Sequence, residues 1–263
     1  RDRYEVMHAF DNTLNLFPMF LGCVAGVKVR ISESISKGDK NEKKTLIKYI
    51  LRPFSHWFTN CYMANSIDCG IWQFGKKTYD RGKVNIFKTV IDANANAFNA
   101  KLREDTRKEF GWENKIVYGF IGRYVPQKNP LFLIDIFNEI AKKQENAILV
   151  MIGFGELENE MHDRIESYGV TDKVIDLGRR DDIKQFYNAF DAFLLPSLYE
   201  GMPVVGIEAQ CSGLPIFFSK NITEETTASE LAYYIGLEET PNIWANKIVK
   251  VVNGHIHLSL IHI

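Results

Sequence analysis

The sequence lacks an excess of charge of either sign, since its 263 residues include 32 Lys and Arg against 33 Asp and Glu. A near-neutral chain gives no reason to expect a nucleic-acid partner. The 46% of apolar and 25% of charged residues are globular proportions, which exclude disordered, collagen-like and coiled-coil proteins. At roughly 150 residues per domain, the length predicts one large or two modest domains.

Long apolar runs are also missing. The longest uncharged run covers residues 12–27 and contains Pro18, Gly22 and Gly26, whereas a membrane-spanning helix needs about 20 apolar residues. We therefore predict a buried helix in this run and no membrane anchor. Arg1 is not followed by a basic and then apolar leader, so no signal peptide is predicted.

Cysteine is scarce, and its positions form no C-x-x-C pair and no metal-ligand spacing, which favours free thiols in a reducing cytosol. The four residues are Cys23, Cys61, Cys69 and Cys211. His255 and His257 form an H-x-H pair, but no third ligand lies near them in the sequence, so we assign no metal site.

From Lys115 onward, short apolar runs alternate regularly with amphipathic segments of helix length. The predicted strands are Ile116–Ile121, Ile148–Ile152, Val174–Leu177, Ala192–Leu195 and Pro215–Phe218. The predicted helices, with apolar residues at i, i+3 and i+4, are Pro130–Lys143, Glu156–Tyr168, Ile183–Ala189 and Pro203–Cys211. Repeated strand–helix units indicate right-handed crossovers, so we predict a doubly wound α/β domain over residues 115–240.

The first half is less regular, but it has similar ingredients and predicts a second α/β unit over residues 1–98. Its clearest elements are strands at Tyr4–His8 and Lys28–Ser32 and helices at Leu14–Ala25 and Thr45–Trp57. The polar stretch 99–114 is predicted to be a linker with a solvated helix. Residues 241–263 are expected to form a C-terminal helix with an atypical tail.

Ligands of an open parallel sheet bind beyond the carboxyl ends of its strands, so the loops after the strands are where a site is expected. The loop after the first strand of the second half contains Arg123 and Lys128, five residues apart. An Arg fork and a Lys point charge at the start of a helix would neutralise a diphosphate. The alternative interpretation is a pair of solvated surface cations.

The loop after the fourth strand is the most informative, because Glu200 and Glu208 flank a helix predicted to start at Pro203. Gly201 relieves crowding before this helix, and the N–H groups of Met202–Val204 would face the crevice. A helix N-terminus holds phosphate through its N–H groups and its dipole, so the arrangement fits a nucleotide-sugar. The alternative is that Glu200 only favours the helix start and that Glu208 is a solvated carboxylate.

Motifs around these residues carry a family resemblance. They are F-I-G-R-Y-V-P-Q-K-N-P, M-I-G-F-G-E, L-G-R-R-D-D, the E-x7-E pair and E-A-Q-C-S-G-L-P. In their order and spacing, the chain from Val117 to Trp244 resembles the donor domain of family 4 glycosyltransferases with the GT-B fold. The resemblance is to enzymes that build bacterial capsular or exopolysaccharides, and it extends more weakly upstream.

The resemblance implies a GT-B architecture, in which two Rossmann-like, doubly wound domains face each other across a cleft. It implies that Arg123 and Lys128 bind the diphosphate of a nucleotide-sugar donor. Glu200 would lie against the transferred sugar as the catalytic residue, and Glu208 would bind the ribose hydroxyls.

The other donor-binding positions that the resemblance implies are Gly201, Met202, Pro203 and Val204, against sugar and phosphate, and Arg180, in a loop bordering the base. The family transfers sugars with retention of anomeric configuration. The chain has no D-x-D motif, the usual means of holding a divalent ion on a nucleotide diphosphate, so we expect neither a metal nor another cofactor.

Three departures from the family pattern favour an alternative. Glu33 stands where the resembling enzymes have a histidine, and Thr89–Asp92 lacks the glycine of the family's N-G-I-D turn. Because Tyr4–His8 already resembles a middle strand of the first domain, we expect an N-terminally truncated member whose first domain is incomplete and which is inactive alone. The alternative is a non-catalytic nucleotide-sugar-binding or regulatory paralogue.

A dinucleotide oxidoreductase, suggested by Gly153-Phe154-Gly155, is a weaker alternative, because the third glycine of G-x-G-x-x-G is Glu158 here. Residues 37–58 have six cations, two acids and apolar residues at helical spacing. They predict either a packed helix with a solvated face or a helix that docks on anionic lipid.

We therefore predict a retaining, metal-independent hexosyltransferase whose donor is a nucleotide-diphosphate sugar, with UDP as the expected nucleotide. Its acceptor would be a polysaccharide or a lipid-linked saccharide in capsule or exopolysaccharide biosynthesis. The expected location is the cytoplasm, with peripheral contact to the inner face of the plasma membrane through residues 37–58 under the second interpretation of that segment.

Overall fold

The structure, a computed structural model, describes residues 4–36, 45–88 and 90–261. Contacts divide the chain into two compact units. The N-terminal unit comprises Arg1–Val90 with the short segments Tyr199–Met202 and Thr223–Glu225, and the C-terminal unit comprises the remaining residues. Of the predicted lipid-docking segment, residues 37–44 lie outside the described part, as does Thr89 of the predicted turn.

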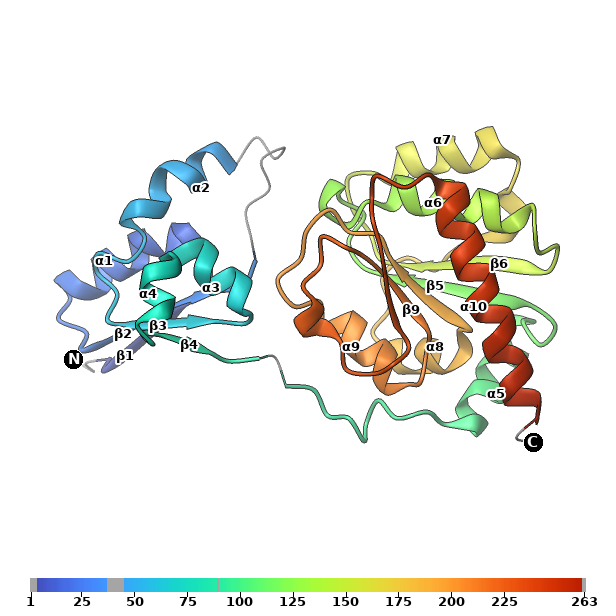
Figure 1. The fold of residues 1–263 in the computed structure, drawn as a ribbon, viewed down its shortest axis with the longest axis horizontal. Helices are drawn as coiled ribbons and strands as arrows, with labels where there is room; N and C mark the ends of the chain where they lie inside the picture. The colour runs from blue at the N-terminus through green and yellow to red at the C-terminus, as the bar shows by residue number, and fades with distance from the viewer. Residues whose placement is uncertain (1–3, 37–44, 89, 262–263) are drawn as a thin grey trace. The chain divides into compact units, whose positions relative to one another are not determined.

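The N-terminal unit is a four-stranded parallel sheet whose spatial order, β1-β2-β3-β4, is the order of the sequence. The strands are β1 (Val6–Ala9), β2 (Val29–Ser34), β3 (Cys61–Ala64) and β4 (Val84–Ile86), and the helices are α1 (Leu16–Val24), α2 (Thr45–Leu51), α3 (Ile67–Phe74) and α4 (Lys76–Asp80). Right-handed crossovers that all advance in one direction put their helices on one face of the sheet, as Figure 1 shows.

This one-sided cover corrects the prediction that residues 12–27 form a buried helix. In α1 only Met19 and Gly22 are buried, whereas Phe17, Leu21 and Val24 are exposed. The helix packs on the sheet with one face, and among the described residues of the unit nothing covers the other. The helix α2 is also shorter than predicted, because Pro53 has no N–H and the chain continues as a 3₁₀ turn over Arg52–Phe54.

The C-terminal unit has a six-stranded parallel sheet in the order β10-β9-β8-β5-β6-β7. Its strands are β5 (Ile116–Ile121), β6 (Ala147–Ile152), β7 (Val174–Asp176), β8 (Ala192–Leu195), β9 (Ile216–Ser219) and β10 (Ala232–Ile235). Its helices are α5 (Ala100–Phe110), α6 (Pro130–Ala141), α7 (Glu158–Tyr168), α8 (Ile183–Ala189), α9 (Val204–Cys211) and α10 (Pro241–Ile261). The predicted strands and helices of this half are confirmed with ends that differ by at most two residues.

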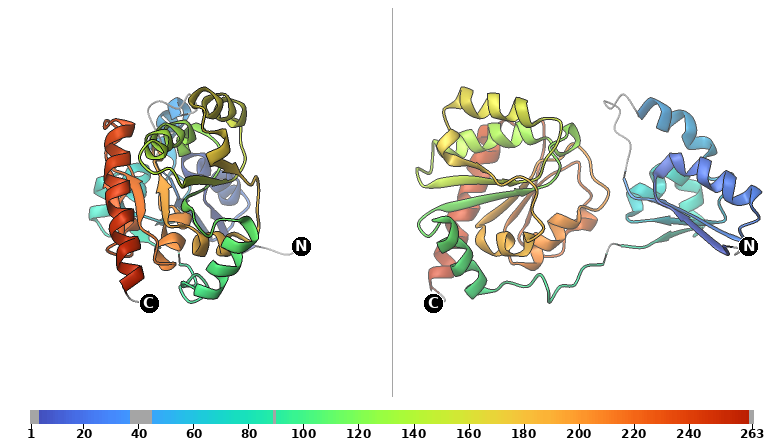
Figure 2. Two further views of the ribbon diagram at one scale, coloured as in Figure 1. Left: turned by 90° about the vertical axis from the view of Figure 1, so that its right-hand side faces the viewer. Right: turned by 180° about the vertical axis from the view of Figure 1, so that it is seen from behind.

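The direction of the chain across this sheet reverses once. From β5 it proceeds through β6 and β7 toward one edge, and from β8 it proceeds through β9 and β10 toward the other. The same handedness rule therefore puts α6 and α7 on one face and α8 and α9 on the opposite face. Helix α10 packs against α6, and Figure 2 shows helices on both faces of the sheet. The predicted doubly wound domain is confirmed.

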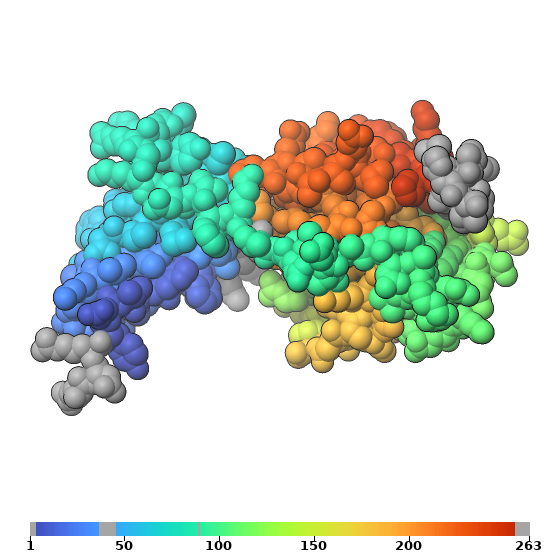
Figure 3. All heavy atoms as spheres, turned by 90° about the horizontal axis from the view of Figure 1, so that it is seen from below, coloured from blue at the N-terminus to red at the C-terminus, as the bar shows by residue number. Residues whose placement is uncertain are grey.

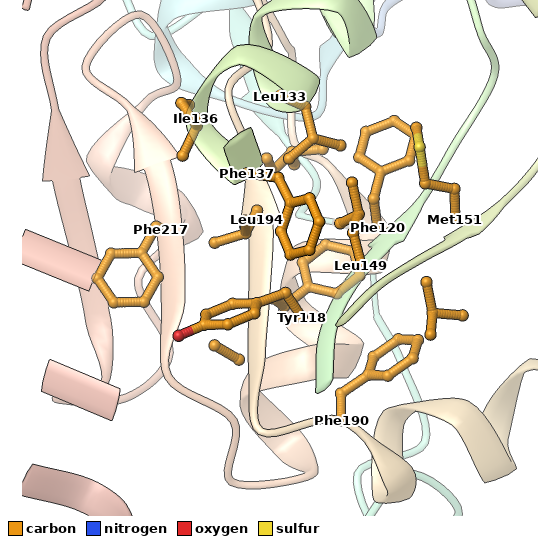
Figure 4. Packing of buried hydrophobic residues seen from close by; sticks show 14 of the residues in the cluster. Tyr118, Phe120, Leu133, Ile136, Phe137, Leu149, Met151, Phe190, Leu194 and Phe217 are labelled. Atoms are coloured by element: carbon orange, nitrogen blue, oxygen red, sulfur yellow. The ribbon is translucent and has the colours of Figure 1, made fainter. Parts of the chain in front are cut away.

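The core of this unit lies between β5, β6 and the helices on either side. Figure 4 shows Tyr118 and Phe120 of β5 packed with Leu149 of β6 and with Leu133 and Phe137 of α6, all five fully buried. Burying each side chain of this size stabilises the fold by about 1.5–3 kcal/mol. Both faces of these strands are covered, which is why they are continuous apolar runs in the sequence rather than alternating ones.

The stretch 99–114, predicted as a linker with a solvated helix, contains the packed helix α5. It lies beside α8 on the surface of the C-terminal unit, green beside yellow-orange in Figure 3. Arg103 and Arg107 of α5 both form ion pairs with Asp191, at the start of β8, and the Arg107 pair measures 3.1 Å. Asp191 also accepts a hydrogen bond from the backbone N–H of Val117, at 2.8 Å. These charged side chains attach α5 to the sheet, and the polar sequence of the helix gave no indication of this contact.

Candidate functional site

The two loops that carry the predicted site residues begin at neighbouring strands. Strands β5 and β8 are adjacent, and the reversal of chain direction lies between them, so the loops after them lead to helices on opposite faces. In open α/β sheets this switch point leaves a crevice where ligands bind. Arg123 and Lys128 lie in the loop after β5, and Glu200 lies in the loop after β8. The structure thus brings the loop of Arg123 and Lys128 together with the first residues of the loop after β8, at the carboxyl ends of the strands. Glu200 itself lies in the short segment Tyr199–Met202, which groups with the N-terminal unit.

Hydrogen bonds join the loops across the switch point. The backbone N–H of Leu198 donates to the carbonyl of Gln127 at 2.8 Å, and the Asn129 side-chain amide donates to the carbonyl of Pro196 at 3.1 Å. Asn129 has a left-handed backbone, with φ of 56°, which asparagine adopts more readily than other residues with a Cβ. This turn ends the loop directly after Lys128 and starts α6.

The loop after β6 packs against the loop after β5 so closely that only glycine fits. A Cβ at Gly153 would lie 1.9 Å from the carbonyl oxygen of Gly122, and a Cβ at Gly155 would lie 2.4 Å from that of Tyr124. The backbone N–H of Tyr124 donates to the carbonyl of Phe154 at 2.9 Å. These glycines therefore serve the packing of two loops, which removes the basis of the dinucleotide interpretation of Gly153-Phe154-Gly155.

A buried tyrosine fastens the first loop to a third one. The Tyr124 hydroxyl donates to a carboxylate oxygen of Asp176 at 2.8 Å, and the same oxygen accepts the backbone N–H of Gly178 at 2.9 Å. Burial, and then the charge of Asp176, raises the pKa of Tyr124 well above its usual range, so the phenol remains a donor. Arg123, the residue before it, is exposed, and Lys128 is half-buried. The backbone that presents both cations is thus bonded to three neighbouring segments, those that follow β6 and β8 and, through Asp176, the end of β7.

The helix after β8 begins one residue later than predicted. Pro203 is the N-cap and Val204 the first residue of α9, so Pro203 does not lie in the first turn. Proline has no N–H, so within Met202–Val204 only the first and last residues could donate to a ligand. The N–H group of Gly206 already donates to the carbonyl of Pro203 at 3.0 Å. The N–H groups of Val204 and Val205 precede the first i→i−4 bond of the helix, and these two meet the conditions for an anion site.

The two glutamates of the E-x7-E pair are in different surroundings. Glu200 lies in the loop, in the segment Tyr199–Met202 that groups with the N-terminal unit. Glu208 is half-buried in α9, four residues after Val204 and so on the same helix face. Helical side chains tilt toward the N-terminus, which directs the Glu208 side chain toward the first turn of α9.

The partner of Glu208 was not predicted from the sequence. The hydroxyl of Tyr187, in α8, donates to a carboxylate oxygen of Glu208 at 2.9 Å. Tyr187 is 1% exposed, and its ring packs on Phe193 of β8. Burial and the charge of Glu208 raise the pKa of Tyr187, and the same two causes raise the pKa of Cys211. A tyrosine on the apolar face of a helix has no signal in the sequence that separates it from an ordinary core residue.

The side chain of Arg180, which was predicted to border the base, contacts residues of its own loop and of α8. Its guanidinium hydrogen-bonds Asp182, with Nε 2.8 Å from Oδ1, and lies over the ring of Phe186, 5.2 Å from the centroid. The neighbouring Arg179 lies 5.9 Å from the ring centroid of Phe154, which is in the loop after β6 and 52% exposed. Arg179, rather than Arg180, therefore contacts the loops that surround the switch point.

In the N-terminal unit, Glu33 pairs with a histidine. The Nε2 atom of His8, in β1, lies 2.8 Å from a carboxylate oxygen of Glu33, in β2. The His8 ring also meets Phe10 edge to face. Because β1 and β2 are adjacent and parallel, both residues lie near the carboxyl ends of their strands. The glutamate that departs from the family pattern thus has a cationic or hydrogen-bonding partner of its own.

The described residues show no metal cluster and no membrane-spanning helix. Within residues 4–36, 45–88 and 90–261, no three His, Cys, Asp or Glu side chains are grouped closely enough to hold a metal ion. The helices in these same ranges include none with the length and apolar character needed to cross a membrane. All four cysteines are free thiols.

Comparison with known proteins identifies a family. The family model described as "Glycosyl transferases group 1" matches residues 103–251. A putative glycosyltransferase of Bacillus subtilis, EpsF, is 29% identical over 252 residues, covering 94% of this chain and 66% of the relative. An Escherichia coli enzyme, named as a UDP-Gal:α-D-GlcNAc-diphosphoundecaprenol α-1,3-galactosyltransferase, is 25% identical over 228 residues, covering 83% of this chain and 58% of that enzyme. The chain thus spans about two thirds or less of the length of these curated relatives.

A solved structure supports the architecture. The Anabaena protein HepE, solved in complex with UDP-glucose, superposes on this chain with a TM-score of 0.79 at 19% identity, covering 97% of this chain and 70% of HepE. At this identity the likeness shows the fold alone, and it confirms the GT-B fold predicted from the sequence.

Proposed function

Because the chain belongs to the group 1 glycosyltransferases, whose family model matches more than half of it, we propose that it binds a nucleotide-diphosphate sugar at the switch point of its C-terminal unit. The whole protein would transfer the sugar, with retention of anomeric configuration, to a polysaccharide or lipid-linked saccharide. The observation that supports this proposal is the pair of bridged loops after β5 and β8, with cations on one and a helix N-terminus on the other.

The charges in these loops suit a diphosphate. Arg123 offers a planar fork of N–H donors and Lys128 a compact positive charge, and both lie on a backbone that neighbouring loops hold in place. The first turn of α9, from Val204, adds backbone N–H donors and the positive end of a helix dipole. Together they would neutralise the charge that grows on the diphosphate as it leaves, so we expect no metal ion to be needed.

Glu200 would act on the transferred sugar. Departure of the diphosphate leaves positive charge on the sugar, and a carboxylate beside the sugar stabilises such charge. Glu208 would accept hydrogen bonds from the ribose hydroxyls. Arg179 and Phe154, in loops that border the switch point, would flank the base in place of the predicted Arg180.

A UDP-sugar is the donor that we propose, and a saccharide on a lipid carrier is the acceptor. The Escherichia coli relative is named for UDP-galactose and for a diphosphoundecaprenol-linked acceptor, and HepE was solved with UDP-glucose. The same chemistry would serve capsule or exopolysaccharide assembly.

Calorimetry on the chain with UDP, GDP and ADP tests the proposed site. Lys128→Ala is expected to weaken nucleotide diphosphate binding about tenfold or more, since a charge-assisted hydrogen bond contributes about 1.5–3 kcal/mol. Lys143→Ala is the matched control, because Lys143 is exposed in the turn between α6 and β6. This turn lies at the amino ends of the strands, away from the proposed site. Equal affinities of the Lys128 variant, the Lys143 variant and the wild type would refute the site.

The exposed apolar side chains of α2 support peripheral membrane contact as part of this proposal. Leu46, Ile47 and Ile50 are 69%, 56% and 58% exposed, beside the cations Lys48 and Arg52. Apolar side chains among cations suit anionic lipid. Flotation with vesicles containing phosphatidylglycerol tests the contact. We expect binding that is lost when the three apolar residues are changed to Gln, whereas no binding by the wild type would rule the contact out.

The His8–Glu33 pair favours one other function, a nucleotide-sugar binder without transferase activity. Glu33 replaces a family histidine, and its pairing with His8 at 2.8 Å gives that position a different chemistry. Donor binding without release of free nucleotide diphosphate over hours would support this second candidate. Release of UDP from a UDP-sugar that depends on Glu200 would exclude it.

A further inference from the structure

The bond between Tyr187 and Glu208 joins two helices on the same face of the sheet. Tyr187 lies in α8, the helix before β8, and Glu208 lies in α9, the helix after β8. The phenol is held in one place because its ring is 1% exposed and packs on Phe193, with ring centroids 5.8 Å apart. A rigid donor therefore contacts a flexible glutamate side chain at 2.9 Å.

A glutamate in a helix has several rotamers, and choosing one of them costs conformational entropy when a ligand binds. A hydrogen bond from a fixed phenol reduces this entropy cost of ligand binding, because the free protein already populates the Glu208 rotamers that keep one carboxylate oxygen on Tyr187. A carboxylate has about four lone-pair positions on its two oxygens, so acceptor capacity remains for a second donor.

On the premise of the proposed function, we infer that Tyr187 is a positioning residue: it holds the carboxylate of Glu208 so that the other oxygen accepts a ribose hydroxyl of the bound nucleotide. The carboxylate cannot donate, so the phenol must, and the raised pKa of Tyr187 keeps its proton in place at neutral pH. The orientation of Glu208 is then fixed before the nucleotide arrives, which improves affinity without adding a contact to the ligand.

Tyr187→Phe tests this role, because it removes the hydroxyl and keeps the ring that packs on Phe193. We expect the affinity for UDP to fall about fivefold to tenfold, and the affinity for 2′,3′-dideoxy-UDP to change less than twofold, since the dideoxy nucleotide has no hydroxyl for Glu208 to accept. A defect of packing alone would weaken both nucleotides equally. Calorimetry at a temperature well below the unfolding of both proteins measures the two affinities.

Tyr168→Phe is the matched control. The Tyr168 hydroxyl also donates to a carboxylate, Asp135 at 2.9 Å, but it lies in α7, on the opposite face of the sheet. The same atom is removed from the same kind of bond, and we expect no change in UDP affinity. A second comparison uses Glu208→Ala with and without Tyr187→Phe. If the tyrosine acts through the glutamate, the two proteins bind UDP equally within twofold.

The outcomes separate the two proposals. If the wild type binds none of the nucleotide diphosphates, the proposed function fails and this inference fails with it. If the wild type binds UDP and Tyr187→Phe binds it as tightly, only the positioning role is overturned. The same holds if Tyr187→Phe weakens UDP and the dideoxy nucleotide alike, or weakens UDP further in the Glu208→Ala protein.

Discussion

Replacing Gly153 by alanine tests how the loops of the proposed nucleotide site are held. The new Cβ would lie 1.9 Å from the carbonyl oxygen of Gly122 and 3.0 Å from the Tyr124 ring. A relaxed carbon–oxygen contact measures about 3.3 Å, so the loops must separate by about 1.4 Å. That movement breaks bonds that now measure 3.0 Å from Gly122 N–H to the Ile152 carbonyl and 2.9 Å from Tyr124 N–H to the Phe154 carbonyl. Overpacking and the lost bonds together should cost about 2–4 kcal/mol.

The cost is measurable as a thermal shift of roughly 5–15 °C, since a domain of this size loses about 2–4 °C per kcal/mol. The nucleotide affinity should fall as well, because the same loop presents Arg123 and Lys128. Gly169→Ala is the control: Gly169 ends α7 with φ of +66°, and no atom lies within 4 Å of its Cβ position. It tests backbone strain alone, about 1 kcal/mol. If Gly153→Ala were no more destabilising than Gly169→Ala and bound UDP like the wild type, the close packing of these loops would be refuted.

Three further predictions concern residues that hold the C-terminal unit together. Asp191→Ala leaves two arginines without their buried partner and should lower the free energy of unfolding in urea by about 3–5 kcal/mol, and a loss below 1 kcal/mol would contradict the buried ion cluster. Asn129→Val, forced into a left-handed backbone, should destabilise by about 1–2 kcal/mol and weaken UDP binding, whereas Asn129→Gly should lose only the bond to Pro196, as paired melting and binding curves would show. The hydrogen bond from Arg180 lowers the pKa of Asp182, so the pair stabilises the fold above pH about 4 and loses this contribution as the pH falls through the lowered pKa. Because the pair is partly exposed, Asp182→Asn should destabilise the protein only slightly at pH 7 and less still at pH 2, and an equal cost at both would contradict the ion pair.

The strands and most helices of the C-terminal unit could be predicted from the sequence, because strands buried on both faces are apolar runs and helices show their own period. The strand β5 was predicted with its exact ends, Ile116–Ile121. The strand β10 was missed, since Ala232–Ile235 contains two tyrosines and lies at a sheet edge, half-buried. Edge strands carry a weaker apolar signal than central ones.

The loops that could form the site were predictable from the sequence, because the carboxyl ends of parallel strands all lie on one side of the domain. The direction of each side chain in these loops could not be predicted, since it depends on contacts between residues far apart in the sequence. Arg180 pairs with Asp182 and Phe186, while Arg179 lies over Phe154. The same limit hid Tyr187, which lies 21 residues before Glu208 and touches it only because α8 and α9 share a face.

The surroundings of α1 and α5 were predicted wrongly for one reason: composition does not report which neighbours a helix has. The apolar α1 is exposed on one side because all crossovers of its sheet fall on the same face. The polar α5 is packed because the buried guanidinium of Arg107 is neutralised by Asp191.

Thermal unfolding with UDP-, GDP- and ADP-sugars tests the central claim, a nucleotide-sugar site at the switch point between β5 and β8, most directly. A ligand at 100 times its dissociation constant adds about 2.7 kcal/mol to the free energy of unfolding, which is a shift of several degrees. We predict that a UDP-sugar raises the unfolding temperature of the wild type and of Lys143→Ala equally, and raises that of Lys128→Ala by about half as much or less, because binding ten times weaker leaves about 1.4 kcal/mol. An equal rise in all three proteins, or no rise with any nucleotide-sugar, would contradict the account.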